Sequence, residues 1–188
     1  MTSGPTSATE QNIPALSYSR RPLLDRARYD FTDYGFTIAA SLSQVFETIP
    51  MEVSDQEAFL FFYPKDDLAI GRFSLFNFHC FLKYTGSIED FAHSRGASVQ
   101  NIALDDTTFN GVTAKIYHRT ISMKELFEGA PQVIDLIGGR PDMVVADSHL
   151  YFIHRHAHFY SGMIHEPGDD DRYEALRSLL IAGITLVG

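Results

Sequence analysis

Ala58-Phe-Leu-Phe-Phe-Tyr63 is the stretch that sets the kind of fold, because it is apolar on both faces of a β-strand. The segment from residue 70 to residue 84 follows with a broadly alternating pattern, which predicts a second strand. Asp66-Asp67 indicates a turn between the two. Together these residues predict two strands of a sheet joined by a short connection.

Further elements follow outward from this pair. Asn110-Gly111 predicts a tight hairpin turn, since both residues tolerate positive φ. Other strands are expected at residues 30–39 as an opening hairpin and at residues 99–104, 112–121, 143–146 and 149–164. Helices are expected at residues 42–49, from Ser87 to near Gly96, in two pieces from the capping box Ser122-Met-Lys-Glu125 to Ile137, and after Asp169-Asp-Asp171.

The order of these elements predicts an α+β fold. No alternation of strand and helix favours a parallel sheet, so we expect a single domain with a large antiparallel β-sheet, covered by helices packed on one side, and a C-terminal helix. Residues 1–28 are expected to form a flexible N-terminal tail and linker, and residues 29–188 the globular domain.

Composition excludes several classes of function. A formal net charge of −9 over 188 residues argues against a general nucleic-acid-binding protein, because such proteins neutralise phosphates with Lys and Arg. A single cysteine, Cys80, cannot form an intramolecular disulfide, and its apolar neighbours predict a buried thiol. No run approaches the roughly 20 apolar residues of a membrane-spanning helix, and no secretory signal is seen. We expect a soluble cytoplasmic protein.

The segment Tyr151-Phe-Ile-His-Arg-His-Ala-His-Phe-Tyr160 carries the most suggestive chemistry. If it is one strand, its alternation places the following residues on a single face: Phe152, His154, His156, His158 and Tyr160. Two adjacent histidines of that row, about 6 to 7 Å apart, could share a divalent transition metal such as zinc with His79 or His118 from a neighbouring strand. The alternative is a solvent-facing sheet surface on which histidine is one polar residue among others.

Two surfaces are candidates for binding a partner or a ligand. The first is the same strand face, at Phe152, His156 and Tyr160. The second is a concave aromatic surface that would receive an apolar ligand or a partner helix, formed by Phe59, Phe61, Tyr63, Phe76 and Phe78. The alternative for these aromatic residues is an ordinary core. The sequence contains no catalytic motif, so no catalytic residue is assigned.

The order of elements also resembles that of the PsbP-like fold family, which includes PsbP, the Ran-binding Mog protein, the DcrB lipoproteins and the Eag effector chaperones. The likeness covers most of residues 30–188. It is carried by residues 34–38, 87–91, 109–117, 150–159 and 173–181. This resemblance implies a non-enzymatic role in binding or assembly, and no functional residue is carried over from it.

The leading expectation is therefore a non-enzymatic cytoplasmic binding or assembly protein, an adaptor or a chaperone, that needs no cofactor and recognises a protein partner. A homodimer is left open. The first alternative is a metal-dependent enzyme or metal-binding protein that uses the histidine face. The second is a protein that binds an apolar ligand.

Overall fold

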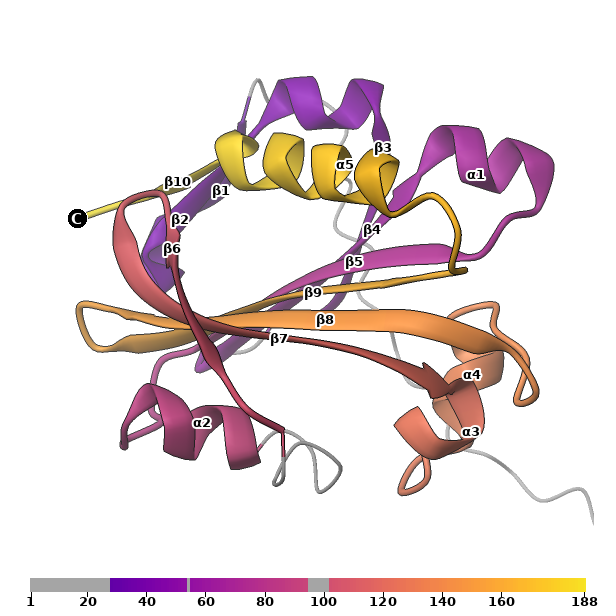
Figure 1. The fold of residues 1–188 in the computed structure, drawn as a ribbon. Coiled ribbons are helices and arrows are strands. Elements are labelled where there is room, and N and C mark those ends of the chain that lie inside the picture. The colour runs from indigo at the N-terminus through magenta and orange to yellow at the C-terminus, as the bar shows by residue number, and fades with distance from the viewer. Residues whose placement is uncertain (1–27, 54, 95–101) are drawn as a thin grey trace, which may run out of the picture.

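The computed structural model describes residues 28–188 except residues 54 and 95–101. Apart from Arg28, the expected tail and linker lie outside the described residues. Within them, the chain folds around one large antiparallel sheet with a smaller sheet and helices packed against it (Figure 1). The predicted α+β class, with a single large antiparallel sheet and a C-terminal helix, is confirmed.

The large sheet has seven strands, and all of its neighbouring strands are antiparallel. In spatial order they are β3 (Phe46–Val53), β4 (Glu57–Pro64), β5 (Ser74–Phe81), β9 (Ala157–His165), β8 (Val144–His154), β7 (Val112–Ser122) and β6 (Asp105–Phe109). Along the sequence, the strands of the β3-β4-β5 edge come first and those of the β6-β7-β8 edge follow. Strand β9 comes last and lies between β5 and β8. Segments distant in sequence meet at this central position.

One face of the large sheet is closed by the small sheet and the C-terminal helix. The small sheet has the order β1 (Arg28–Phe31), β2 (Phe36–Ala39) and β10 (Ile184–Leu186), with the short 3-10 helix η1 (Thr32–Tyr34) between β1 and β2. Helix α5 (Asp170–Gly183) lies beside it (Figure 1). The main core fills this interface, and its fully buried aromatic side chains include Phe36, Phe78, Phe152 and Phe159.

Among the residues that the structure describes, those on the opposite face cover it only at its two ends. Helix α2 (Ile88–Ser94) lies over one end, and α3 (Met123–Leu126) with α4 (Gln132–Leu136) lies over the other (Figure 1). Each end has its own hydrophobic cluster, one around Phe91 and one around Met123 and Ile134. Helices therefore pack on both sides of the sheet, not on one side as expected, because strands such as β4 carry apolar residues on both faces.

Several local predictions are confirmed. Ser122 and Glu125 form the expected capping box at the start of α3, and Asn110, at φ 47°, turns the chain from β6 into β7. The first strand of that hairpin begins at Asp105, between the strands expected at residues 99–104 and 112–121, because residues 105–109 pair with β7. The predicted strand at residues 99–104 lies largely outside the described residues.

Two other local predictions are wrong, one of a helix and one of a turn. The helix expected at residues 42–49 is a short 3-10 helix, η2 (Ala40–Gln44), followed directly by β3. Pairing with β4 and burial of Phe46 against Phe62 and Phe76 outweigh the helical spacing. The turn expected at Asp66-Asp67 is helix α1 (Lys65–Ile70), in which the buried Asp67 carboxylate accepts hydrogen bonds from β5 and α5.

Candidate functional site

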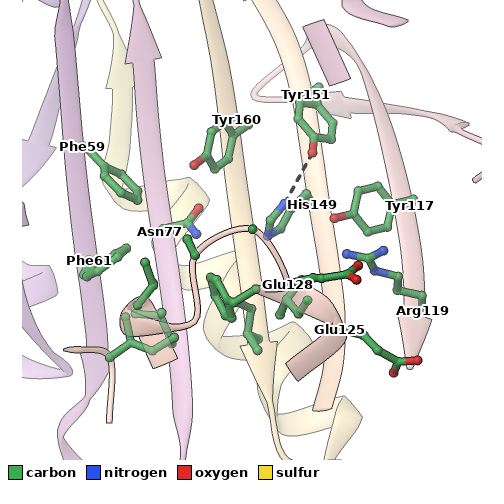
Figure 2. Close-up of a pocket in the computed structure, with 18 residues that line it drawn as sticks. Phe59, Phe61, Asn77, Tyr117, Arg119, Glu125, Glu128, His149, Tyr151 and Tyr160 are labelled. Carbon is green, nitrogen blue, oxygen red and sulfur yellow. Dashed lines mark hydrogen bonds between the residues drawn. The ribbon is translucent and has the colours of Figure 1, made fainter. Parts of the chain in front are cut away.

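A cavity of about 670 Å³ lies on the half-covered face, between the two ends that the helices cover. Its floor is made by side chains of β4, β5, β9, β8 and β7, and one wall is made by the segment from Glu125 to Ile137 that contains α3 and α4 (Figure 2). Because strand side chains alternate, only every second residue of each strand reaches this floor. The sheet thus supplies a fixed surface and the α3–α4 segment supplies a cover.

The part of the cavity next to β4 is apolar and aromatic. Phe59 and Phe61 project from β4 with their ring centroids 4.7 Å apart and their planes nearly perpendicular. Leu126 and Phe127 face them from α3 and its C-terminal end, together with Ile137 after α4. Edge-to-face rings of this kind present both ring edges and ring faces, which suits a flat apolar molecule.

The part next to β7 and β8 is polar. The side chain of Asp147 is fully buried, and its Oδ2 atom accepts hydrogen bonds from Arg119 Nε at 2.7 Å and from the Tyr117 hydroxyl at 3.2 Å. The guanidinium of Arg119 lies 5.3 Å from the centre of the Tyr117 ring. A buried carboxylate needs such partners to offset its lost hydration. The ion pair and the hydroxyl therefore form one internally compensated unit.

His149 lies at the centre of this polar wall. Its ring stacks on Tyr160 with centroids 5.5 Å apart, its Nδ1 atom lies 3.4 Å from the Tyr151 hydroxyl, and its Nε2 atom lies 3.3 Å from Asp147 Oδ1. Burial lowers the pKa of His149, and the positive charges of Arg177 and Arg119 lower it further, against the opposing effect of Asp147. The imidazole is therefore neutral near pH 7.

Gly162 on β9 makes this arrangement possible. A Cβ atom at this position would lie 2.5 Å from His149 Nε2 and 2.6 Å from Asn77 Oδ1, both shorter than real contacts. The backbone N–H of Gly162 donates a 2.9 Å hydrogen bond to the same Asn77 oxygen. The missing side chain thus lets His149 and Asn77 reach across β9 from the strands on either side.

The chemistry of the polar wall is hydrogen bonding by neutral groups. Burial raises the pKa of Tyr117 and of Tyr151 far above the ordinary value, helped in both cases by the charge of Asp147. Both hydroxyls keep their protons, and the Tyr117 hydroxyl donates to Asp147. The cavity therefore combines an aromatic region, neutral polar groups and one compensated ion pair.

The histidine row expected from the sequence is not formed. Strand β8 ends at His154 and β9 begins at Ala157, with Arg155, at φ 57°, in the two-residue turn between them. The prediction of one strand over residues 149–164 is wrong, because Phe152 pairs with Phe159 across a hairpin and both rings enter the main core. His156 is exposed at the turn.

The remaining predicted metal ligands are spread over both faces. His158 faces α2, where Nε2 lies 3.0 Å from the Gly86 carbonyl oxygen, whereas His154 shares the face of Phe152. His118 is exposed on β7, and His79 packs between Phe59 and Phe81 with Nδ1 3.1 Å from the Tyr160 hydroxyl. In the described part of the chain, no group of three or more His, Cys, Asp or Glu side chains is placed to hold a metal ion.

The two predicted binding surfaces are divided in a similar way. Of Phe152, His156 and Tyr160, only Tyr160 lines the cavity. Of the five aromatic residues expected to form a concave surface, Phe59 and Phe61 line the cavity, Tyr63 packs near it, and Phe76 and Phe78 lie in the main core on the other face. The separation follows from strand alternation, since successive even and odd positions face opposite sides.

Sequence reasoning missed most of the polar wall. Asp147, His149 and Tyr151 alternate on β8, and Tyr117 and Arg119 do the same on β7. Polar residues at every second position of a strand were the available signal. The three histidines at residues 154–158 form a more conspicuous pattern of the same kind, and the metal prediction was built on them instead. Asn77, alone between apolar residues of β5, carried no comparable signal.

Comparison with known proteins gives structural likeness alone. No family model matches the sequence, and no curated protein matches it. The fold is similar to the solution structure of cyanobacterial PsbP from Synechocystis sp. PCC 6803, with a TM-score of 0.47 and 11% identity over 87% of this chain and 95% of that one. It is also similar to a crystal structure from Bacteroides thetaiotaomicron VPI-5482, with a TM-score of 0.46 and 11% identity over 82% of this chain.

The chain spans less than half of the Bacteroides protein, covering 46% of its length. One of these two structures is a PsbP protein, of the fold family that the sequence resembles, and the likeness is one of fold alone. None of the helices in the described segments combines the length and apolar character needed to cross a membrane.

Proposed function

We propose that this protein is a non-catalytic binding protein that holds a small amphipathic molecule in the cavity on the half-covered face. The observation that carries the proposal is the cavity itself, whose volume of about 670 Å³ lies in the range of small-molecule sites, about 300–1,000 Å³. Such sites combine a largely apolar lining with a few polar groups that fix orientation. Phe59, Phe61 and Phe127 supply the first, and Asn77, Tyr117 and His149 the second.

The arrangement is also preorganised. The floor residues lie on strands in the middle of the sheet, and His149 is held by Tyr160, Tyr151 and Asp147 from three directions. A ligand that enters such a site orders few protein side chains, so little of its interaction energy is lost to conformational entropy. This supports binding to a surface already formed in the free protein.

The expected adaptor or chaperone role, with a protein partner and a cytoplasmic location, stays a prediction, as does the metal-dependent alternative. An inserted partner side chain would use the same cavity as a small ligand. Titration with a small molecule tests the proposal made here directly, because it measures whether the cavity takes up a ligand when no protein partner is present.

The test uses N-phenyl-1-naphthylamine, an uncharged two-part aromatic probe whose fluorescence rises in apolar surroundings. Ala130 lines the cavity and is half-buried, so Ala130→Phe fills part of the space. Ala69 is exposed on α1, and Ala69→Phe is the matched control. We expect one saturable site per chain, about tenfold weaker or lost in Ala130→Phe and unchanged in Ala69→Phe.

Two results would overturn the proposal. The first is the absence of saturable binding to the wild-type protein. The second is equal binding by Ala130→Phe, provided that its circular dichroism spectrum and melting temperature show the same fold as the wild type. Either result would mean that the cavity is a packing feature of the sheet.

A further inference from the structure

We propose that the cavity selects an uncharged ligand, with a flat apolar body and one hydroxyl or amide group, and rejects the anion of the same shape. This inference rests on the proposed function and adds the class of molecule. It follows from how each charged and polar group around the cavity is already engaged.

Among the described residues that line the cavity, Arg119 is the cationic side chain, and its charge is balanced by Asp147. Its Nε atom donates to Asp147 at 2.7 Å, and the Asp147 side chain has no exposed surface. An anionic ligand that drew Arg119 away would leave a buried carboxylate without its counterion, which is strongly unfavourable. An anion that instead met the terminal N–H groups of Arg119 would face an ion pair whose charge Asp147 already balances, so Arg119 offers an anion little net attraction.

His149 supplies no positive charge in its place. The imidazole is enclosed by Tyr117, Tyr151 and Tyr160, and the Arg177 and Arg119 charges disfavour its protonation. Asp147 on the same strand favours the charged form but is already paired with Arg119. The wall therefore meets a ligand as a neutral surface.

Two carboxylates at the rim add repulsion for anions. Glu125 and Glu128 line the cavity from α3 and the segment after it, and both are exposed (Figure 2). Hydrogen bonds from the side chain and the backbone N–H of Ser122 lower the pKa of Glu125, so this carboxylate stays ionised. With Asp147 balancing Arg119, the two glutamates leave the cavity region negatively charged. The net charge of −9 acts in the same direction at longer range.

The neutral polar groups match an uncharged ligand. Asn77 Oδ1 accepts the N–H of Gly162, which leaves the amide N–H groups of Asn77 as donors. The Tyr117 hydroxyl donates to Asp147, and its oxygen remains able to accept. A ligand group that both accepts and donates, such as a hydroxyl or a primary amide, is complementary to this pair.

The experiment compares two displacers of bound N-phenyl-1-naphthylamine that have nearly the same shape. These are naphthalene-1-carboxamide, which is uncharged, and naphthalene-1-carboxylate, which is an anion at neutral pH. We expect the amide to displace the probe at a concentration at least about tenfold lower than the carboxylate. The ratio of the two displacing concentrations, carboxylate over amide, should be about two- to threefold smaller in Glu128→Gln. Asp66→Asn on α1 removes the same charge from an exposed site outside the cavity and should leave the ratio unchanged.

The outcomes separate this inference from the proposed function. If the probe does not bind at all, the proposed function fails and this inference fails with it. If the probe binds but the carboxylate displaces it as well as the amide does, only the selection of uncharged ligands is overturned. An equal change of the ratio in Asp66→Asn and Glu128→Gln would also contradict it, because net charge rather than the rim would then set the preference.

Discussion

Replacement of Gly162 by alanine tests the geometry of the site with the smallest possible change. The new Cβ atom would lie 2.5 Å from His149 Nε2 and 2.6 Å from Asn77 Oδ1. Neither side chain can move easily, since His149 is enclosed by Tyr117, Tyr151 and Tyr160, and Asn77 is buried. We expect both side chains to be displaced and the polar wall of the cavity to be disrupted.

The expected loss of stability can be worked out from three terms. Overpacking of a well-filled site costs about 1–3 kcal/mol. Loss of the 2.9 Å hydrogen bond from the Gly162 N–H to Asn77 leaves a buried donor poorly satisfied, at about 1–3 kcal/mol. Alanine in place of glycine within a strand recovers about 0.5–1 kcal/mol. The net free energy of unfolding should fall by about 1–5 kcal/mol.

Urea unfolding followed by circular dichroism measures this change. Gly129→Ala is the matched control, because a Cβ atom there meets nothing within 4 Å, and its stability should stay within about 0.5 kcal/mol of wild type. In a His149→Ala background the Gly162→Ala change should cost less, since one of the two clashes is gone. If Gly162→Ala alone is as stable as wild type, the close approach of His149 and Asn77 across β9 is not a feature of the folded protein.

Other substitutions test contacts outside the cavity. Burial alone raises the pKa of Asp67, but hydrogen bonds from Arg172 and two hydroxyls hold it below its ordinary value, so wild-type stability should fall as pH drops below about 4. Asp67→Asn should be about 2–4 kcal/mol less stable at pH 7 and lack that acid-dependent loss, as urea titrations at both pH values would show. Asn110→Gly keeps the turn but removes two hydrogen bonds, to carbonyls in the last turn of α5 and at the start of β10, and should lower the melting temperature through a loss of about 1–2 kcal/mol. Burial raises the pKa of the Cys80 thiol to about 12, so a disulfide reagent at about pH 8 should label it only after unfolding, and rapid labelling of native protein would contradict its burial.

Local sequence rules were sufficient where a short segment supplies the hydrogen bonds or the backbone conformation that its own structure needs. Ser122 and Glu125 cap α3 reciprocally, and Asn110 adopts the positive φ that the hairpin needs, so both features follow from two or three adjacent residues. The overall class follows for a similar reason. A chain without strand–helix alternation builds its sheet from hairpins. The expected cover on one side was wrong, because strands apolar on both faces need covering layers on both sides.

Local rules failed where pairing at a distance decides the structure. Residues 42–49 have helical spacing, but Phe46 is drawn into the core by Phe62 and Phe76, and its strand pairs with β4. The turn at Arg155-His156 contains no glycine, asparagine or proline. It is imposed by the pairing of Phe152 with Phe159 inside the core, and an uninterrupted strand over the same residues is locally just as plausible.

The cavity itself depends on strand order, which the sequence does not state. Phe61, Asn77, Gly162, His149 and Tyr117 form one row across β4, β5, β9, β8 and β7, although β9 is the last of these strands in the chain. If helices covered this face completely, a row of apolar side chains would stabilise the fold more than a row with buried charges. This face instead holds a buried ion pair, a neutral histidine and a glycine that makes room for them, between two separate apolar clusters. Stability alone does not explain a polar row at this position, and this is the reason for proposing that the row recognises a polar group on an apolar ligand.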